Sequence, residues 1–321
     1  MILQGLLSTL YQVAQMALVL ALAPLLTGLV RAAKARLAGR RGPPLLQPYA
    51  NLAKLMRKEP VVAHEASWLF RAAPYIVFAT VWVAAGLVPT FTTALALAPV
   101  ADLIVLVAML GVARFFTALA ALDAGTPFGG IGASRETFIA ALAEPAMLMV
   151  IFTLAILLRT TSLAGIVDGI VGGEGVGLRV SLALGLVSLV MVAIAETGRI
   201  PVDNPATHLE LTMVHEAMVL EYSGRHLALM EAAGMLRLFL FVALIACVFA
   251  PFGIAQPGDG PLALLAGLLG FAAKMGAAAL LLAGFETSVA KMRVFRLGEF
   301  LGTALLLGLL AAIFLFVSTG L

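Results

Sequence analysis

Long, continuous runs of apolar residues separated by short polar stretches dominate this chain. A helix needs about 20 apolar residues to cross the hydrocarbon core of a bilayer. Because the runs are continuous rather than alternating, they predict helices and not the strands of a membrane barrel. We expect about eight spans, at residues 5–30, 68–90, 98–122, 137–159, 178–195, 226–250, 261–284 and 298–319.

The composition supports this prediction. Of the 321 residues, 62% are apolar and 12% are charged, whereas soluble globular domains have about 45–50% apolar and about 25% charged residues. These values exclude an ordinary soluble enzyme and a disordered protein. We therefore expect residues 1–321 to form a single all-α integral membrane domain, a bundle of about eight transmembrane helices with long cytoplasmic loops.

The basic residues predict the orientation of the bundle. Lys and Arg accumulate in the cytoplasmic loops of membrane proteins. Here most of the 20 basic residues fall in or beside alternate connections, and these are therefore expected to be cytoplasmic: approximately 31–67, 123–136, 196–225 and 285–297. With eight spans, both termini then lie on the non-cytoplasmic side of a bacterial inner membrane.

The first of these loops carries a candidate docking surface. Arg40 and Arg41 precede Pro43 and Pro44, and proline fixes φ and removes a backbone donor, so this stretch is expected to be extended or turned. Residues 45–58 mix apolar and basic positions, which predicts an amphipathic helix at the membrane surface. Such a helix either anchors the loop to lipid headgroups or forms a rigid docking surface for a cytoplasmic partner. Both remain open.

The third loop is unusually rich in acids and histidines. Pro205 favours the start of a helix, and a helix is predicted over residues 206–222. The alternatives are a solvated acidic face and an acidic interface that titrates and docks a partner; we favour the interface. Its candidate residues are Glu196, Arg199, Asp203, His208, Glu210, His215, Glu216 and Glu221.

The sequence does not support a metal or redox centre in this chain. On one helix, His208 and His215 would lie about 10.5 Å apart along the axis, too far to bind one ion together. The segment that begins at His215 also lacks the second histidine of a zinc protease motif. The single cysteine, Cys247, cannot hold an iron–sulfur cluster alone.

Charged residues inside the predicted spans suggest a path for protons. Ionisable groups in a membrane are costly and commonly functional. The candidates lie between the cytoplasmic end and the midplane: Glu144, Glu231, Arg114, Arg237 and Lys274. Beyond them only Asp102 is charged, so we expect protons to leave sideways to a neighbouring subunit. The alternative is ion pairs that only hold helices together, Glu231 with Arg237 or Arg114 with Glu144; both roles can coexist.

At these loops the sequence resembles the complex I subunit 1 family, and most of all its branch in formate hydrogenlyase, hydrogenase-4 and related energy-converting NiFe hydrogenases. The matching segments are Arg40-Arg41-Gly42-Pro43 with Gln47-Pro48; Gly132-Ala133 with Arg135 and Glu144; and Ala195-Glu196-Thr197 with Arg199, Pro201 and Glu221-Tyr222-Ser223-Gly224. The hydrogenase branch is favoured by residues 203–208 and 215–218, by Glu286-Thr287-Ser288 and by Lys291-Met292-Arg293.

The resemblance implies a non-catalytic membrane subunit of an oxidoreductase complex, placed between a hydrophilic redox arm and antiporter-like membrane subunits. It implies contacts with a small iron–sulfur subunit and a large catalytic subunit. Those partners would hold iron–sulfur clusters and possibly a NiFe centre, and this chain would hold no cofactor. It further implies that intramembrane acids couple the redox reaction to proton translocation.

Lys274 is expected to need a carboxylate partner, which we place on an adjacent antiporter-like subunit. A purely structural anchor and a stand-alone ion transporter remain alternative functions. The expected partners are proteins and the lipid bilayer, and no nucleic acid.

Overall fold

The structure is a computed structural model that describes residues 2–62, 66–173, 180–203, 214–290, 292 and 296–319. Within these residues the chain forms helices joined by loops, and β-type pairing is limited to two isolated bridges, Thr92 with Ala255 and Asp102 with Ser162. The predicted all-α membrane fold is confirmed.

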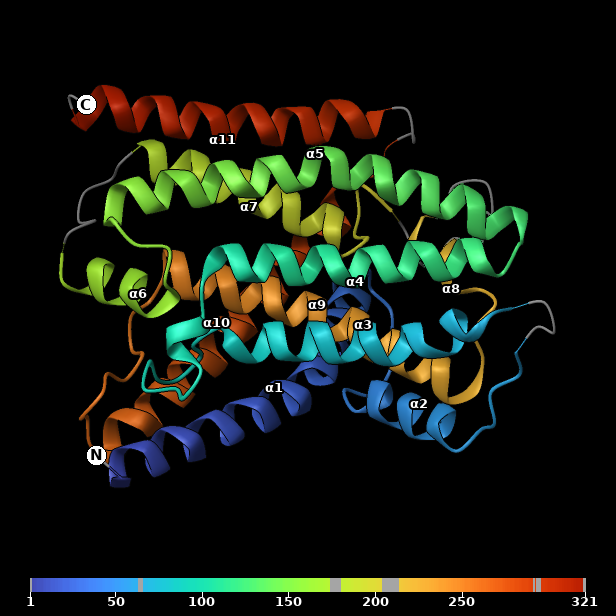
Figure 1. Ribbon diagram of the computed structural model, residues 1–321, viewed down its shortest axis with the longest axis horizontal. Coiled ribbons are helices and arrows are strands. Elements are labelled where there is room, and N and C mark those ends of the chain that lie inside the picture. Colours follow the sequence, from blue (N-terminus) through green and yellow to red (C-terminus); the bar gives the residue numbers. More distant parts are fainter. Residues whose placement is uncertain are drawn as a thin grey trace.

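In the described part of the chain, eight long helices form the bundle, and Figure 1 shows how they are arranged. Seven of those in the described part are long and apolar enough to cross a membrane, and α7 is equally apolar but has 17 residues. Residues 174–179, just before α7, lie outside the described residues, so the start of the predicted span 178–195 does too. The long helices are α1 (Ile2–Leu37), α3 (Trp68–Leu87), α4 (Leu103–Asp123), α5 (Pro127–Leu158), α7 (Val180–Glu196), α9 (Gly224–Phe249), α10 (Pro261–Ser288) and α11 (Leu297–Thr319).

Several predicted loops are shorter than expected because helices continue past the apolar runs. Residues 31–37 belong to α1 and 285–288 to α10. Most of the predicted loop 123–136 is helix, since α5 begins at Pro127. Thr126 caps this helix by accepting a hydrogen bond from the Gly129 amide, and Pro127 suits the first helical turn. At 32 residues, α5 is longer than a span requires.

Four short helices lie in the connections. α2 (Gln47–Met56) falls within the amphipathic segment predicted at 45–58, whereas α6 (Leu163–Val171) was not expected. Of the helix predicted over 206–222, the described residues contain α8 (His215–Val219) followed by a turn at 220–221, and 204–213 lies outside the described residues. A 3₁₀ turn, η1 (Ala98–Val100), precedes α4.

The helices pack around a central, buried α9. Its neighbours include α1, α3 and α7, while α11 packs on α5 and α7 at one side and α10 packs on α1 at the other. Phe239 and Phe241 of α9 are fully buried. Both chain ends lie at one end of the bundle, on the left in Figure 1, and α2 and α8 lie at the opposite end. The second end is the one that the basic residues predict to be cytoplasmic.

Candidate functional site

Arg114, in the middle of α4, joins carboxylates from two other helices. Its Nη1 lies 2.5 Å from Oε1 of Glu196, the last residue of α7, and its Nη2 lies 2.6 Å from Oε1 of Glu144 in α5. The Arg114 side chain is 6% exposed. Two charge-assisted hydrogen bonds from one guanidinium are a strong and directional arrangement. The predicted pair of Arg114 with Glu144 is therefore present, with Glu196 added.

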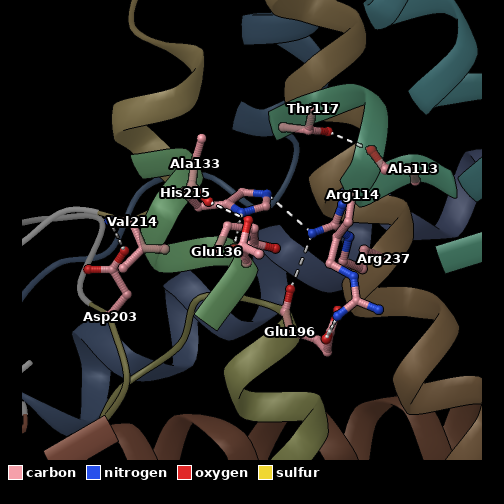
Figure 2. A network of polar contacts seen from close by, with 11 residues as sticks. Ala113, Arg114, Thr117, Ala133, Glu136, Glu196, Asp203, Val214, His215 and Arg237 are labelled. Atoms are coloured by element: carbon pink, nitrogen blue, oxygen red, sulfur yellow. Dashed lines mark hydrogen bonds and ion pairs between the residues drawn. The ribbon is translucent and has the colours of Figure 1, made fainter. Parts of the chain in front are cut away.

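His215 connects this pair of contacts to further buried charges. Its Nδ1 lies 3.8 Å from Oε2 of Glu136 in α5, and its Nε2 lies 3.3 Å from Nη1 of Arg237 in α9. The same Nη1 donates to the backbone carbonyl of Glu196 at 3.4 Å. Figure 2 shows these side chains converging from α4, α5, α7, α8 and α9. We refer to Arg114, Glu136, Glu144, Glu196, His215 and Arg237 as the buried charge network.

The buried part of this network balances its charges. The carboxylates of Glu136 and Glu196 lie beside the guanidinium groups of Arg114 and Arg237, and the partly exposed His215 and Glu144 lie at the edges of the network. Because an unpaired charge in a buried site is unfavourable, these central groups stabilise one another. Among the described residues, Nε of both arginines and Oε2 of Glu196 are buried without a hydrogen-bond partner. All three atoms are available to bind water, and Glu196 Oε2 can also accept a proton.

The network is buried at its centre and exposed at two ends. The side chains of Glu136 and Glu196 are 7% and 3% exposed, whereas His215 is 31% and Glu144 is 41% exposed. His215 opens toward the end of the bundle that holds α2 and α8. Glu144 lies opposite Gly111 of α4, on the flank where α4 meets α5. A proton could therefore enter at one end and leave on the flank.

Two of the predicted path residues lie apart from the network. Glu231 is exposed on α9, and six residues separate it from Arg237, which places the two on different faces of the helix. The predicted pair of Glu231 with Arg237 is therefore wrong; the charges near Glu231 are those of Arg31 and Glu216. Lys274 donates through Nζ to the carbonyl of Phe252 at 2.6 Å, in the connection after α9.

The predicted docking residues divide into exposed and buried groups. Arg40, Arg41 and Glu221 are exposed, and Glu216 is partly buried. Asp203 is instead buried, and its carboxylate accepts a hydrogen bond from the Val214 amide at 3.1 Å, next to His215. Glu196 is buried in the network. The structure therefore places Glu196 and Asp203 inside the protein and not on a docking surface. His208 and Glu210 lie outside the described residues.

Glu286 of α10 forms a second buried ion cluster that the sequence did not indicate as a site. Its Oε2 lies 3.0 Å from Nζ of Lys34 in α1, and its Oε1 lies 3.1 Å from Nη1 of Arg199. Arg199 follows Glu196 by three residues, so the turn after α7 connects this cluster to the buried charge network. Glu286 lies in a segment that favours the hydrogenase branch, but an acid near a helix end is ordinary in sequence, which is why it was not predicted as a site.

The hydropathy pattern did not predict that Glu136 lies in a helix, although another signal in the sequence indicates it. The pattern places it in the loop 123–136 because the apolar run begins after it. Thr126 and Pro127, however, form a helix-start signal. A helix that begins there places Glu136 two turns before Glu144 and about 80° away around the axis. Within the described part of the chain, no group of three or more His, Cys, Asp or Glu residues could hold a metal ion.

Comparisons with known proteins identify the family. The family model described as NADH dehydrogenase matches residues 10–317, which is almost the whole chain. The chain belongs to this family. The resemblance found from the sequence, to subunit 1 of complex I, is thereby confirmed.

The similarity of this NADH dehydrogenase family member to individual proteins agrees with the predicted branch. It is 32% identical to formate hydrogenlyase subunit 4 of Escherichia coli K12, over 89% of this chain and 92% of that protein. It is 35% identical to hydrogenase-4 component C of the same organism, over 77% and 76% of the two chains. A subunit of the NADH-quinone oxidoreductase of Rickettsia prowazekii is 27% identical, over 65% of this chain and 63% of that protein.

A solved structure has the same fold. A chain in the structure of the membrane-bound sulfane sulfur reductase, an archaeal respiratory membrane complex, superposes with a TM-score of 0.80, at 20% sequence identity. The match covers 95% of this chain and 98% of that chain. The two chains therefore share one arrangement of helices.

Proposed function

We propose that this chain is the membrane subunit of a respiratory-type redox complex related to formate hydrogenlyase and hydrogenase-4. In this proposal it anchors the hydrophilic arm and couples the arm's redox reaction to proton translocation. Membership of the NADH dehydrogenase family and the two hydrogenase-related relatives support the assignment to such a complex. The observation that supports the coupling role is the buried charge network, in which carboxylates, arginines and a histidine from five helices meet and some buried polar atoms have no hydrogen-bond partner among the described residues.

The route begins at His215 and ends at Glu144. His215 is accessible enough to take a proton from the side of α8, and its imidazole can pass a proton through Nδ1 to Glu136. Arg114 holds Glu196 and Glu144 on one guanidinium, so a change in charge at one carboxylate is felt by the other. When Glu136 takes up a proton, the more positive surroundings of Arg114 favour release of a proton held by Glu144, and that proton leaves sideways, through the α4–α5 flank, to an adjacent antiporter-like subunit.

The partners follow from the same proposal. A small iron–sulfur subunit and a large catalytic subunit bind at the end of the bundle that carries α2 and α8. They hold the iron–sulfur clusters and, in a hydrogenase, the NiFe centre. This end faces the cytoplasm and both termini face the opposite side of an inner membrane. Arg40 and Arg41 dock the arm. The route from His215 to Glu144 does not include Glu231 or Lys274, and their place on a proton path stays a prediction from the sequence.

Purification tests membership of a complex. The chain, tagged at its C-terminus and extracted from native membranes in a mild detergent, should bring down an iron–sulfur subunit and a large catalytic subunit. Reversing both charges, Arg40→Glu with Arg41→Glu, should release the arm from the membranes, because the two side chains are exposed and adjacent. If the chain purifies alone and exports protons or sodium ions from liposomes, it is a stand-alone transporter instead.

Everted vesicles test the coupling role. Vesicles driven by formate or hydrogen allow proton uptake to be measured per hydrogen molecule evolved or consumed. Glu136→Gln and Glu196→Gln should each lower this ratio while the redox reaction continues. Glu299→Gln, on the exposed face of α11, is the matched control and should keep the ratio. A ratio that stays unchanged in the assembled Glu136 and Glu196 variants would leave only the structural anchor.

The part of the path assigned to Lys274 needs its own variant. Lys274→Met should lower the proton ratio without dissociating the subunits, because the ammonium contacts only a backbone carbonyl among the described residues. An unchanged ratio would remove Lys274 from the path and leave the rest of the proposal intact.

A further inference from the structure

A basic hollow lies where α2 ends and α9 begins. It has a volume of about 390 Å³, within the size range of small ligand sites. The residues that line it are Met56, Arg57, Lys58, Glu59, Pro60 and Arg225. Three cations therefore face a single acid. This hollow shares no residue with the buried charge network.

The floor of the hollow is fixed by contacts between the segment after α2 and the start of α9. Ser223 Oγ accepts a hydrogen bond from the Val61 amide at 2.7 Å and donates one to the Val61 carbonyl at 3.1 Å. Gly224 has a φ of +52°, and a Cβ placed on it would lie 2.5 Å from the Glu59 carbonyl oxygen. The chain thus holds Arg57, Lys58 and Arg225 around the hollow in a defined arrangement.

Among the described residues that line the hollow, the positive charges outnumber the negative one. Among the described residues, none of its three cations forms an ion pair. The N-terminal end of α9 adds the positive end of a helix dipole. Arg71, at the start of α3, is close enough that its charge and that of Arg225 both act on the ring of His226. An anion is therefore the ligand that this surface favours.

The surroundings of the hollow indicate which anion. Met56, Val61 and Trp68 are 54%, 77% and 74% exposed, and they lie where α2 ends and α3 begins. Exposed apolar and Trp side chains beside basic residues are typical of the membrane interface, where acyl chains meet headgroups. Basic pockets between transmembrane helices bind anionic headgroups. A ligand with a phosphate and acyl chains satisfies both the cations and the apolar rim.

We propose that this hollow binds the phosphate of an anionic phospholipid. Arg57, Lys58 and Arg225 hold the phosphate, and the acyl chains extend past Met56 and Val61. The bound lipid would fix the end of α2 against the start of α9. The proposal does not depend on the redox function, because lipid binding to this hollow can be measured on the isolated chain without the hydrophilic arm.

Lipid titration of the full chain tests the proposal. The delipidated protein, purified in detergent, is titrated with phosphatidylglycerol, with cardiolipin and with phosphatidylcholine, and bound lipid is counted by native mass spectrometry. The triple variant Arg57→Gln, Lys58→Gln, Arg225→Gln should bind the anionic lipids at least about 10-fold more weakly, since each basic residue near a headgroup contributes appreciably. Arg225→Gln alone should give an intermediate weakening, and phosphatidylcholine should bind weakly throughout.

A matched control removes three other exposed cations, Arg36, Lys54 and Arg296, by the same change to glutamine. This control should bind anionic lipid within about twofold of the parent protein. Equal loss in both triple variants would show general surface attraction and overturn the site. Displacement of the lipid by inorganic phosphate would assign the hollow to a free anion. Retained lipid binding with loss of a partner subunit would make it a protein-docking site.

Discussion

Arg114→Met removes both hydrogen bonds that join α4 to α5 and α7 through their carboxylates. Each charge-assisted hydrogen bond contributes about 1.5–3 kcal/mol. The contact with Glu144 belongs at the low end, because that carboxylate is 41% exposed, whereas Glu196 is 3% exposed and would be left as an unpaired buried acid. We expect the free energy of unfolding to fall by about 3–5 kcal/mol, the usual cost of breaking a buried ion pair.

A double-mutant cycle separates the two contacts. Reversible unfolding by SDS in mixed micelles, followed by circular dichroism, gives the free energy of unfolding for Arg114→Met, Glu196→Gln, Glu144→Gln and the two double variants. The coupling energy between Arg114 and Glu196 should be about 2–3 kcal/mol, and that between Arg114 and Glu144 about 1 kcal/mol or less. Arg114→Lys should retain part of the stability, since an ammonium cannot contact both carboxylates with a planar fork.

Glu231→Gln provides the control, because Glu231 is exposed and does not contact Arg114. Its coupling with Arg114→Met should lie within about 0.5 kcal/mol of zero. Coupling with Glu196 that is no larger than coupling with Glu231 would refute the reasoning. So would a larger coupling with Glu144 than with Glu196, because burial would then not determine the strength of the contact.

Three further predictions concern stability in the same assay. Gly224→Ala should destabilise the protein by about 2 kcal/mol, since the φ of +52° and the nearby Glu59 carbonyl both oppose a Cβ; no effect would contradict the tight turn. Glu286→Gln should destabilise by about 2 kcal/mol, and adding Arg199→Gln should cost little more, because each removes the other's partner. Tyr222→Phe should cost about 1 kcal/mol by removing a hydrogen bond to a carbonyl of α3. Burial raises the pKa of Tyr222, so above about pH 10 the Tyr222 hydroxyl ionises only in the unfolded chain. The parent protein should therefore lose stability above that pH, and Tyr222→Phe should lack this part of the loss.

The sequence alone determined the class of the protein and its family. The apolar runs are long enough that only membrane-spanning helices can satisfy their backbone groups, so the architecture followed from length and hydropathy. Both specific loops, around Arg40 and around Glu196, were sufficient to indicate the family. The pair of Arg114 with Glu144 could also be predicted from the sequence, because two opposite charges inside apolar helices have few other partners.

Helix boundaries and the partners of charged residues required the tertiary structure. Hydropathy marks where a helix meets lipid but not where it ends, so α5 extended ten residues before the predicted span and brought Glu136 into the site. Glu231 and Arg237 appeared to be partners because they share a helix, yet they point in different directions. Glu196 and Asp203 were predicted to lie on a docking surface for the same reason: hydropathy does not show which charged residues the packed helices bury.

Glu286 shows most clearly what only the fold could decide. It lies 252 residues from Lys34 and 87 from Arg199 in sequence, and nothing along the chain links the three. They meet because α1 and α10 pack together and the turn after α7 reaches their ends. A buried charge needs a partner, but sequence cannot say which distant cation supplies it, since that is fixed by how the helices pack.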